Sequence, residues 1–87
     1  KDPERQLPVC INIAEQISSG DERIFGVMID SNLVGGRQDL VAGETLCYGQ
    51  SITDGCIDWN TSEQVLKILS DAVLARRTAK LNNYSEQ

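Results

Sequence analysis

The fold is indicated most directly by one apolar run, Ile24-Phe25-Gly26-Val27-Met28-Ile29, which stops abruptly at Asp30-Ser31-Asn32. The run is continuous rather than alternating, which is typical of a strand buried on both faces in a parallel sheet covered by helices. Polar residues at the C-terminal end of such a strand are where (β/α)8 barrels carry their chemistry. The stretch therefore predicts an α/β fold, with Asp30 at its chemically active edge.

A helix is predicted on each side of this central part of the chain. Residues 7–19 show apolar positions at i, i+3, i+4 and i+7, with Pro8 in the first turn and Gly20 as the stop. These positions are Cys10, Ile13, Ala14 and Ile17. A second helix is predicted to begin near Thr61, which has capping-box spacing to Gln64, or at the alternative cap Asn60.

The second helix has one apolar stripe, and residues 82–87 after it are expected to fray. The stripe consists of Val65, Ile68, Leu69, Ala72 and Val73. Before this helix, a short strand over residues 50–53 is predicted to end at Asp54, after a glycine-containing loop over residues 31–49. Two strands do not form an independently stable sheet. Residues 1–81 are therefore expected to be the C-terminal part of a single larger domain.

Composition excludes several classes of function. The 87 residues contain no histidine, so no Ser-His-Asp or Cys-His site can form within the chain. The formal net charge of -5 disfavours nucleic acid and anionic membranes as partners. No apolar run approaches the roughly 20 residues that cross a bilayer. Three cysteines without a CxxC pair suggest reduced thiols and a cytoplasmic protein.

The candidates for chemistry are Asp30 and Asp54, because each follows a predicted strand. Carboxylates there bind divalent metals or act as general bases, although aspartate is also common in turns. The stretch Gly35-Gly36-Arg37 suggests a weak anion site, for which a flexible turn is the favoured alternative. Cys56 is expected to be a buried thiol, and Trp59 is expected to pack under the final helix.

Two motifs resemble one family in particular. They are Gly26-Val27-Met28-Ile29-Asp30-Ser31-Asn32-Leu33-Val34-x-Gly36-x-Gln38 and Tyr48-Gly49-Gln50-Ser51-Ile52-Thr53-Asp54-x-Cys56-Ile57-x-Trp59. In order and separation they are similar to the C-terminal segment of class I 3-deoxy-D-arabino-heptulosonate-7-phosphate (DAHP) synthase. The resemblance implies the last two strands and flanking helices of a (β/α)8 (TIM) barrel, and a homo-oligomer is expected.

The resemblance also implies an activity. The family condenses phosphoenolpyruvate with erythrose 4-phosphate and releases phosphate, in the first step of the shikimate pathway. It uses a divalent metal such as Mn²⁺, Fe²⁺ or Co²⁺, bound by a cysteine, a histidine, a glutamate and an aspartate. Asp54 matches the family's aspartate and would also contact the substrate as a catalytic residue, and Asp30 stands at the glutamate. The other two ligands would lie upstream, so the chain alone is expected to be inactive.

The sequence departs from the family pattern at several positions. Asp30 is one methylene shorter than glutamate, so its carboxylate reaches roughly 1.5 Å less far. Metal–ligand distances tolerate errors of only a few tenths of an ångström. The other differences are at Gly35, Arg37, Gly55 and Asp58. Two alternatives therefore stand beside an active synthase: a diverged barrel that has lost metal binding, and a non-catalytic module that self-associates.

Overall fold

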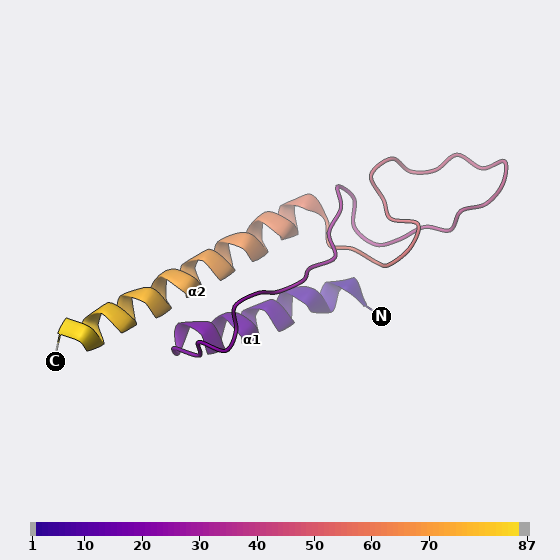
Figure 1. Ribbon diagram of the computed structural model, residues 1–87. Coiled ribbons are helices and arrows are strands. Elements are labelled where there is room, and N and C mark those ends of the chain that lie inside the picture. The colour runs from indigo at the N-terminus through magenta and orange to yellow at the C-terminus, as the bar shows by residue number, and fades with distance from the viewer. Residues whose placement is uncertain (1, 86–87) are drawn as a thin grey trace.

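The computed structural model describes residues 2–85 and contains two long helices joined by an extended connection (Figure 1). A 3-10 turn, η1 (Pro3–Arg5), leads into α1 (Gln6–Ser18), and α2 (Trp59–Ser85) closes the chain. The two helices lie side by side and run in the same direction, as Figure 1 shows. Parallel neighbouring helices are the arrangement that successive β/α units produce.

The bounds of α1 follow from residues at its two ends. Asp2 caps η1, with its Oδ1 accepting a hydrogen bond from the Glu4 amide at 3.0 Å. Pro8 lies in the first turn of α1, where a missing N–H removes no helical hydrogen bond. Gly20 has φ of 101°, a left-handed conformation that ends the helix. The predicted helix and its buried face are confirmed, with Cys10, Ala14 and Ile17 buried.

The core lies along the seam between the two helices, in two clusters. Cys10, Ile57 and Val65 form the first, and Ala14, Ile17 and Ala72 form the second. Val65 is 1% exposed, the most buried large side chain of the described residues. The Cys10 thiol donates to the Val65 carbonyl at 4.0 Å, and burial raises the pKa of Cys10. Cys10 is therefore a buried core residue, as its place on the apolar face predicted.

The start of α2 differs from the prediction. The helix begins at Trp59, and Asp58 caps it: its Oδ1 accepts from the Thr61 amide at 2.8 Å. The Ser62 hydroxyl also donates to the Asp58 carbonyl at 2.7 Å. Asp58, rather than Thr61 or Asn60, is the N-cap because an ionised carboxylate is a strong acceptor and carries a favourable charge at a helix N-terminus. Trp59 is 55% exposed rather than packed beneath the helix.

We expect this cap to make the stability of the protein depend on pH. Hydrogen bonding from Thr61 lowers the pKa of Asp58 below its usual 3.8. The capping contribution is therefore complete above 3.8 and is lost as the pH falls through the lower folded-state pKa. We expect Asp58→Ala to lower the melting temperature at pH 7 and Asp58→Asn to preserve most of it. Thermal unfolding from pH 7 to pH 2 checks this: the gap between wild type and Asp58→Ala should narrow in acid, and a constant gap would contradict it.

The main difference between the predicted and the observed fold concerns the strands. Within residues 2–85 there is no strand, only isolated bridges: parallel Ser31–Ile57, antiparallel Gly36–Cys56 and parallel Arg37–Ser51. The run over residues 24–29 is extended but lacks a neighbour with which to form a ladder. A strand forms only where a neighbouring segment pairs with it by hydrogen bonds, so the apolar pattern alone was not enough to predict one.

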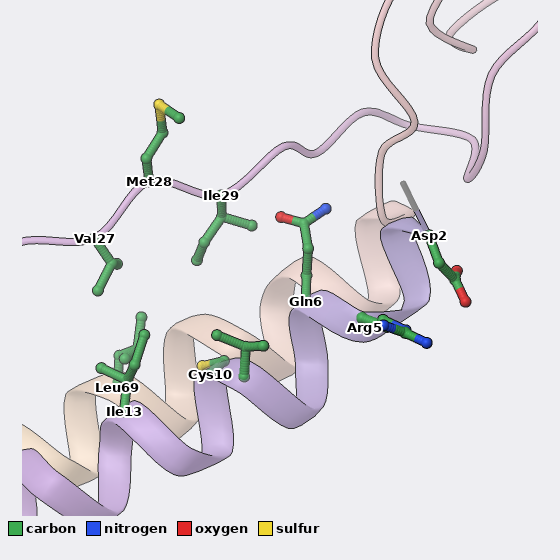
Figure 2. Close-up of a pocket in the computed structure, with 10 residues that line it drawn as sticks. Asp2, Arg5, Gln6, Cys10, Ile13, Val27, Met28, Ile29 and Leu69 are labelled. Carbon is green, nitrogen blue, oxygen red and sulfur yellow. The ribbon is translucent and has the colours of Figure 1, made fainter.

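The extended run still behaves as one side of a sheet would. In Figure 2, Val27 and Ile29 point toward the helices, whereas Met28 points away. Ile29 packs on the first core cluster, while Met28 is 89% exposed and Phe25 is 95% exposed. Phe25 shares the alternating face of Val27 and Ile29, so the helices cover this face only in part, at Ile29, and the face of Met28 is open. This differs from the burial on both faces that the sequence predicted.

The last helix reaches the end of the described residues. The helix α2 extends to Ser85, so residues 82–85 of the segment expected to fray are helical. Residues 86 and 87 of that segment lie outside the described residues. Near the same end, the Arg76 guanidinium donates to the carbonyls of Asp21 and Ile24, both at 2.8 Å, and ties α2 to the turn after α1.

Candidate functional site

The backbone of Asp30 makes hydrogen bonds to two partners, Gln6 and Ile57. The side-chain amide of Gln6, at the start of α1, makes two hydrogen bonds to it: Asp30 N donates to Gln6 Oε1 at 2.8 Å, and Gln6 Nε2 donates to Asp30 O at 2.9 Å. In addition, Ile57 N donates to the same Asp30 carbonyl at 2.9 Å. Asn32 N then donates to Ile57 O at 3.0 Å. The peptide of Asp30 is thus fully bonded, while its carboxylate is exposed to solvent.

Asp54 lies in a bend rather than at the end of a strand. Residues 52–54 form this bend, and the stretch that pairs with Ser31 is found three residues later, at Ile57. The Cys56 thiol donates to the Asp54 carbonyl at 3.5 Å, and Cys56 itself is buried, as predicted. The predicted strand over residues 50–53 is not formed: of these residues only Ser51 pairs, in an isolated bridge with Arg37, and paired residues lie on both sides of the bend that contains Asp54.

Asp30 and Asp54 both lie close to Ile57. Ile57 touches the Asp30 backbone directly, and Asp54 is three residues before Ile57, within about 11 Å along even a fully extended chain. Neither carboxylate has a hydrogen bond or an ion pair among residues 2–85, so both remain available to a ligand. Oxygen donors of this kind suit hard or borderline divalent cations.

The described part of the chain does not complete a metal site. In residues 2–85, no three cysteine, aspartate or glutamate side chains lie close enough together to hold an ion. Asp30 and Asp54 can therefore contribute to a metal centre but do not complete one of the zinc type, which uses three or four protein ligands. Their donor chemistry fits a divalent cation; the ligand count requires further residues.

The loop between Ser31 and Asp58 is built around glutamine side chains. Gln38 Nε2 donates to the carbonyls of Cys47 and Gln50, at 2.8 and 3.0 Å, and Gln38 Oε1 accepts from Cys47 N at 2.9 Å. Gln50 Nε2 in turn donates to Gly35 O at 2.9 Å. These bonds replace the strand ladder that the loop lacks and fix the path of the chain that leads into Asp54.

Arg37 has a structural role in this loop. Its Nε donates to Thr53 O at 2.8 Å, and its guanidinium pairs with Asp39 at 3.0 Å. Both contacts hold the residue next to Asp54 and engage the guanidinium within the loop. The turn interpretation of Gly35-Gly36-Arg37 is thus favoured over the anion site, since Arg37 binds the chain itself.

Two other departures from the family pattern also have local structural explanations. Asp58 caps α2. At Gly55, a Cβ atom would lie 3.0 Å from Pro3 Cγ, so a larger residue would require η1 to move. Together with Arg37, these substitutions serve the packing of the loop and the helix ends.

Sequence reasoning missed Gln6 and Gln38, which fix the backbone around the two aspartates. A signal for Gln6 was present. It lies four residues before Cys10, on the same face of α1 as the apolar positions, and a polar residue on a buried stripe often bonds to backbone. Gln38 lies in an irregular loop without periodicity, and its place in the first family motif was the only signal for it.

Two further observations concern the chain as a whole. Cys10, Cys47 and Cys56 are all free thiols. Among the helices of residues 2–85, none has the length and apolar character needed to span a membrane.

Comparisons with known proteins agree on one family. The family model described as the DAHP synthetase I family matches residues 1–67. The chain is 55% identical over 82 residues to a phospho-2-dehydro-3-deoxyheptonate aldolase of Haemophilus influenzae, covering 94% of this chain and 23% of that protein. It is 48% identical over 73 residues to the Phe-sensitive aldolase of Escherichia coli, covering 84% of this chain and 21% of that protein.

A solved structure gives the same result. The phospho-2-dehydro-3-deoxyheptonate aldolase of Francisella tularensis superposes with a TM-score of 0.79 at 45% identity, over 86% of this chain and 21% of that one. The chain thus spans between a fifth and a quarter of the length of the relatives it matches. Motifs, identity and superposition point the same way, and the chain belongs to the DAHP synthetase I family.

Proposed function

We propose that this chain is the C-terminal portion of a metal-dependent DAHP synthase, which condenses phosphoenolpyruvate with erythrose 4-phosphate. The observation that carries the proposal is the pair of uncommitted carboxylates, Asp30 and Asp54, on a backbone fixed by Gln6 and Ile57. Because this backbone is fixed while the carboxylates of Asp30 and Asp54 stay exposed, we interpret the two residues as ligand-binding rather than as turn residues. The names of the relatives, all phospho-2-dehydro-3-deoxyheptonate aldolases, support the reaction.

The fold of the complete protein would be a TIM barrel, to which this segment supplies its last two strand positions. The packing of Ile29 on the helices and the exposure of Met28 on the other face support this, because the face of Met28 is the one that would meet the barrel interior. The parallel helices agree with two successive β/α units. The ladder would form when the preceding strand is present.

In the reaction, Asp30 and Asp54 would bind a divalent cation such as Mn²⁺, Fe²⁺ or Co²⁺ together with ligands outside this chain. The cation, when bound, would polarise the aldehyde of erythrose 4-phosphate. Asp54 would hold the aldose in line by hydrogen bonding while the enol carbon of phosphoenolpyruvate forms the new carbon–carbon bond. Uptake of water and release of phosphate complete the balance. The 87-residue chain alone would be inactive, since it supplies only part of the site.

The setting would be the cytoplasm, which the three free thiols favour. A homo-oligomer is proposed for the complete protein, with no role for nucleic acid or membrane, in agreement with the net charge of -5.

Metal removal tests the proposal. We expect the complete protein to release phosphate from phosphoenolpyruvate only when erythrose 4-phosphate is present. A chelator should abolish turnover, and added Mn²⁺ should restore it. A folded, metal-supplied protein without turnover would favour a diverged barrel, the second candidate. The observation behind that candidate is the shorter reach of Asp30, and Asp30→Glu should then tighten Mn²⁺ binding in a calorimetric titration.

A further inference from the structure

The side chain of Gln6 bonds to the backbone of Asp30 in the way that a neighbouring strand would. A peptide group in a β-ladder offers one donor and one acceptor to its neighbour. The Gln6 amide offers the same pair and uses both on a single residue, at 2.8 and 2.9 Å. Figure 2 shows the Gln6 side chain rising from α1 toward the extended segment just beyond Ile29.

Within the described chain, the helix α1 makes hydrogen bonds to residues 24–30 at one residue only, Asp30. Packing fixes the preceding residue, because Ile29 lies against the first core cluster. With Ile57 N donating to the same carbonyl, Asp30 makes three backbone hydrogen bonds to other parts of the chain, more than are found for any of residues 24–29.

We propose that Gln6 is a positioning residue for the Asp30 carboxylate, which it aims by clamping the Asp30 peptide. The inference rests on the proposed role of Asp30 as a metal ligand. Metal sites tolerate errors of about 0.2 Å in ligand distance, and the outer residues that orient ligands are as much part of the site as the ligands are. The clamp is all the more needed here, since aspartate has fewer rotatable bonds than glutamate with which to correct a misplaced backbone.

The test uses the complete protein and Gln6→Met, which keeps the length of the side chain and removes both hydrogen bonds. We expect Mn²⁺ affinity, measured by calorimetric titration, to fall about 10- to 100-fold, the usual cost of losing an orienting partner. Gln16→Met is the matched control. Gln16 lies on the same helix and its side chain bonds, among the described residues, only to Asn12, at 2.7 Å, so its replacement should change affinity by less than about twofold.

A double-mutant cycle separates positioning from general destabilisation. If Gln6 acts through the Asp30 carboxylate, Gln6→Met should have little further effect on Mn²⁺ affinity in the Asp30→Asn background. An equal loss in both backgrounds would overturn the inference. Affinity unchanged by Gln6→Met, while Asp30→Asn weakens it, would overturn the inference and leave the proposed function standing. Affinity unchanged by Asp30→Asn would remove the metal role of Asp30 and the inference with it.

Hydrogen exchange of the metal-free protein gives a second readout that needs no metal. Gln6→Met should accelerate exchange at the Asp30 amide and spare the amide of Ser62, which bonds to Asp58 O at 3.0 Å in α2. Faster exchange at both amides would indicate global loosening and would contradict a local clamp, as would unchanged exchange at Asp30.

Discussion

Replacing Asp54 with asparagine in the complete protein should reduce kcat/KM on the order of 10³-fold, because one substitution removes two proposed roles. The amide is a neutral and weaker metal ligand, and it also differs in the hydrogen bonds that it offers to the aldose. The size and shape of the side chain are nearly unchanged, and Asp54 makes only a backbone contact, through its carbonyl, to Cys56. The loss should therefore appear in turnover and metal affinity, with little change in unfolding temperature.

The matched control is Asp71→Asn on α2. Asp71 is also an exposed aspartate, and its surface pair with Lys67 at 3.1 Å contributes little to stability. We expect kcat/KM within about twofold of wild type for this variant, since surface changes of this kind are usually small. Steady-state kinetics with both substrates varied would decide. Equal activity for Asp54→Asn and Asp71→Asn would remove Asp54 from the site.

The largest expected effect on stability is at Ile17. This side chain is 4% exposed and packs in the second cluster against Ala72 of α2. Truncation to alanine leaves a cavity between two helices whose backbones cannot close on it freely. The free energy of unfolding should fall by about 2–5 kcal/mol for Ile17→Ala.

A graded series provides the control for this prediction. Ile17→Val removes one methyl group and should cost about 0.5–1.5 kcal/mol. Urea unfolding of the three proteins, with activity measured below the transition, separates loss of packing from loss of the site. If Ile17→Ala cost no more than Ile17→Val, the seam between α1 and α2 would not be the core that the burial indicates.

The helices were predictable because their signals are local. The apolar spacing from Cys10 to Ile17, the stop at Gly20 and the stripe on the last helix each depend on residues within a few turns. The cap was missed because Asp58, Asn60 and Thr61 are all acceptable caps by type. Only the three-dimensional path of the loop decides which of them faces the free amides of α2.

The extended segments were predicted less well because pairing is not local. Residues 24–29 have the composition of a strand, yet the described chain holds no second segment that runs beside them over their length. The position of Asp54 was misjudged for the same reason, since the bend at residues 52–54 depends on contacts from Arg37 to Thr53 and from Gln38 to Gln50. Asp30 and Asp54 became candidates because each follows a predicted strand, and the family motifs then assigned them roles, whereas Gln6 emerged only from the structure.

The most direct test of the central claim is anomalous diffraction from crystals of the complete protein soaked with Mn²⁺. We predict one strong peak with an oxygen of Asp30 and an oxygen of Asp54 both within about 2.0–2.4 Å, the range for divalent cations and carboxylates. A peak bound by neither aspartate, or by only one of them, would contradict the account.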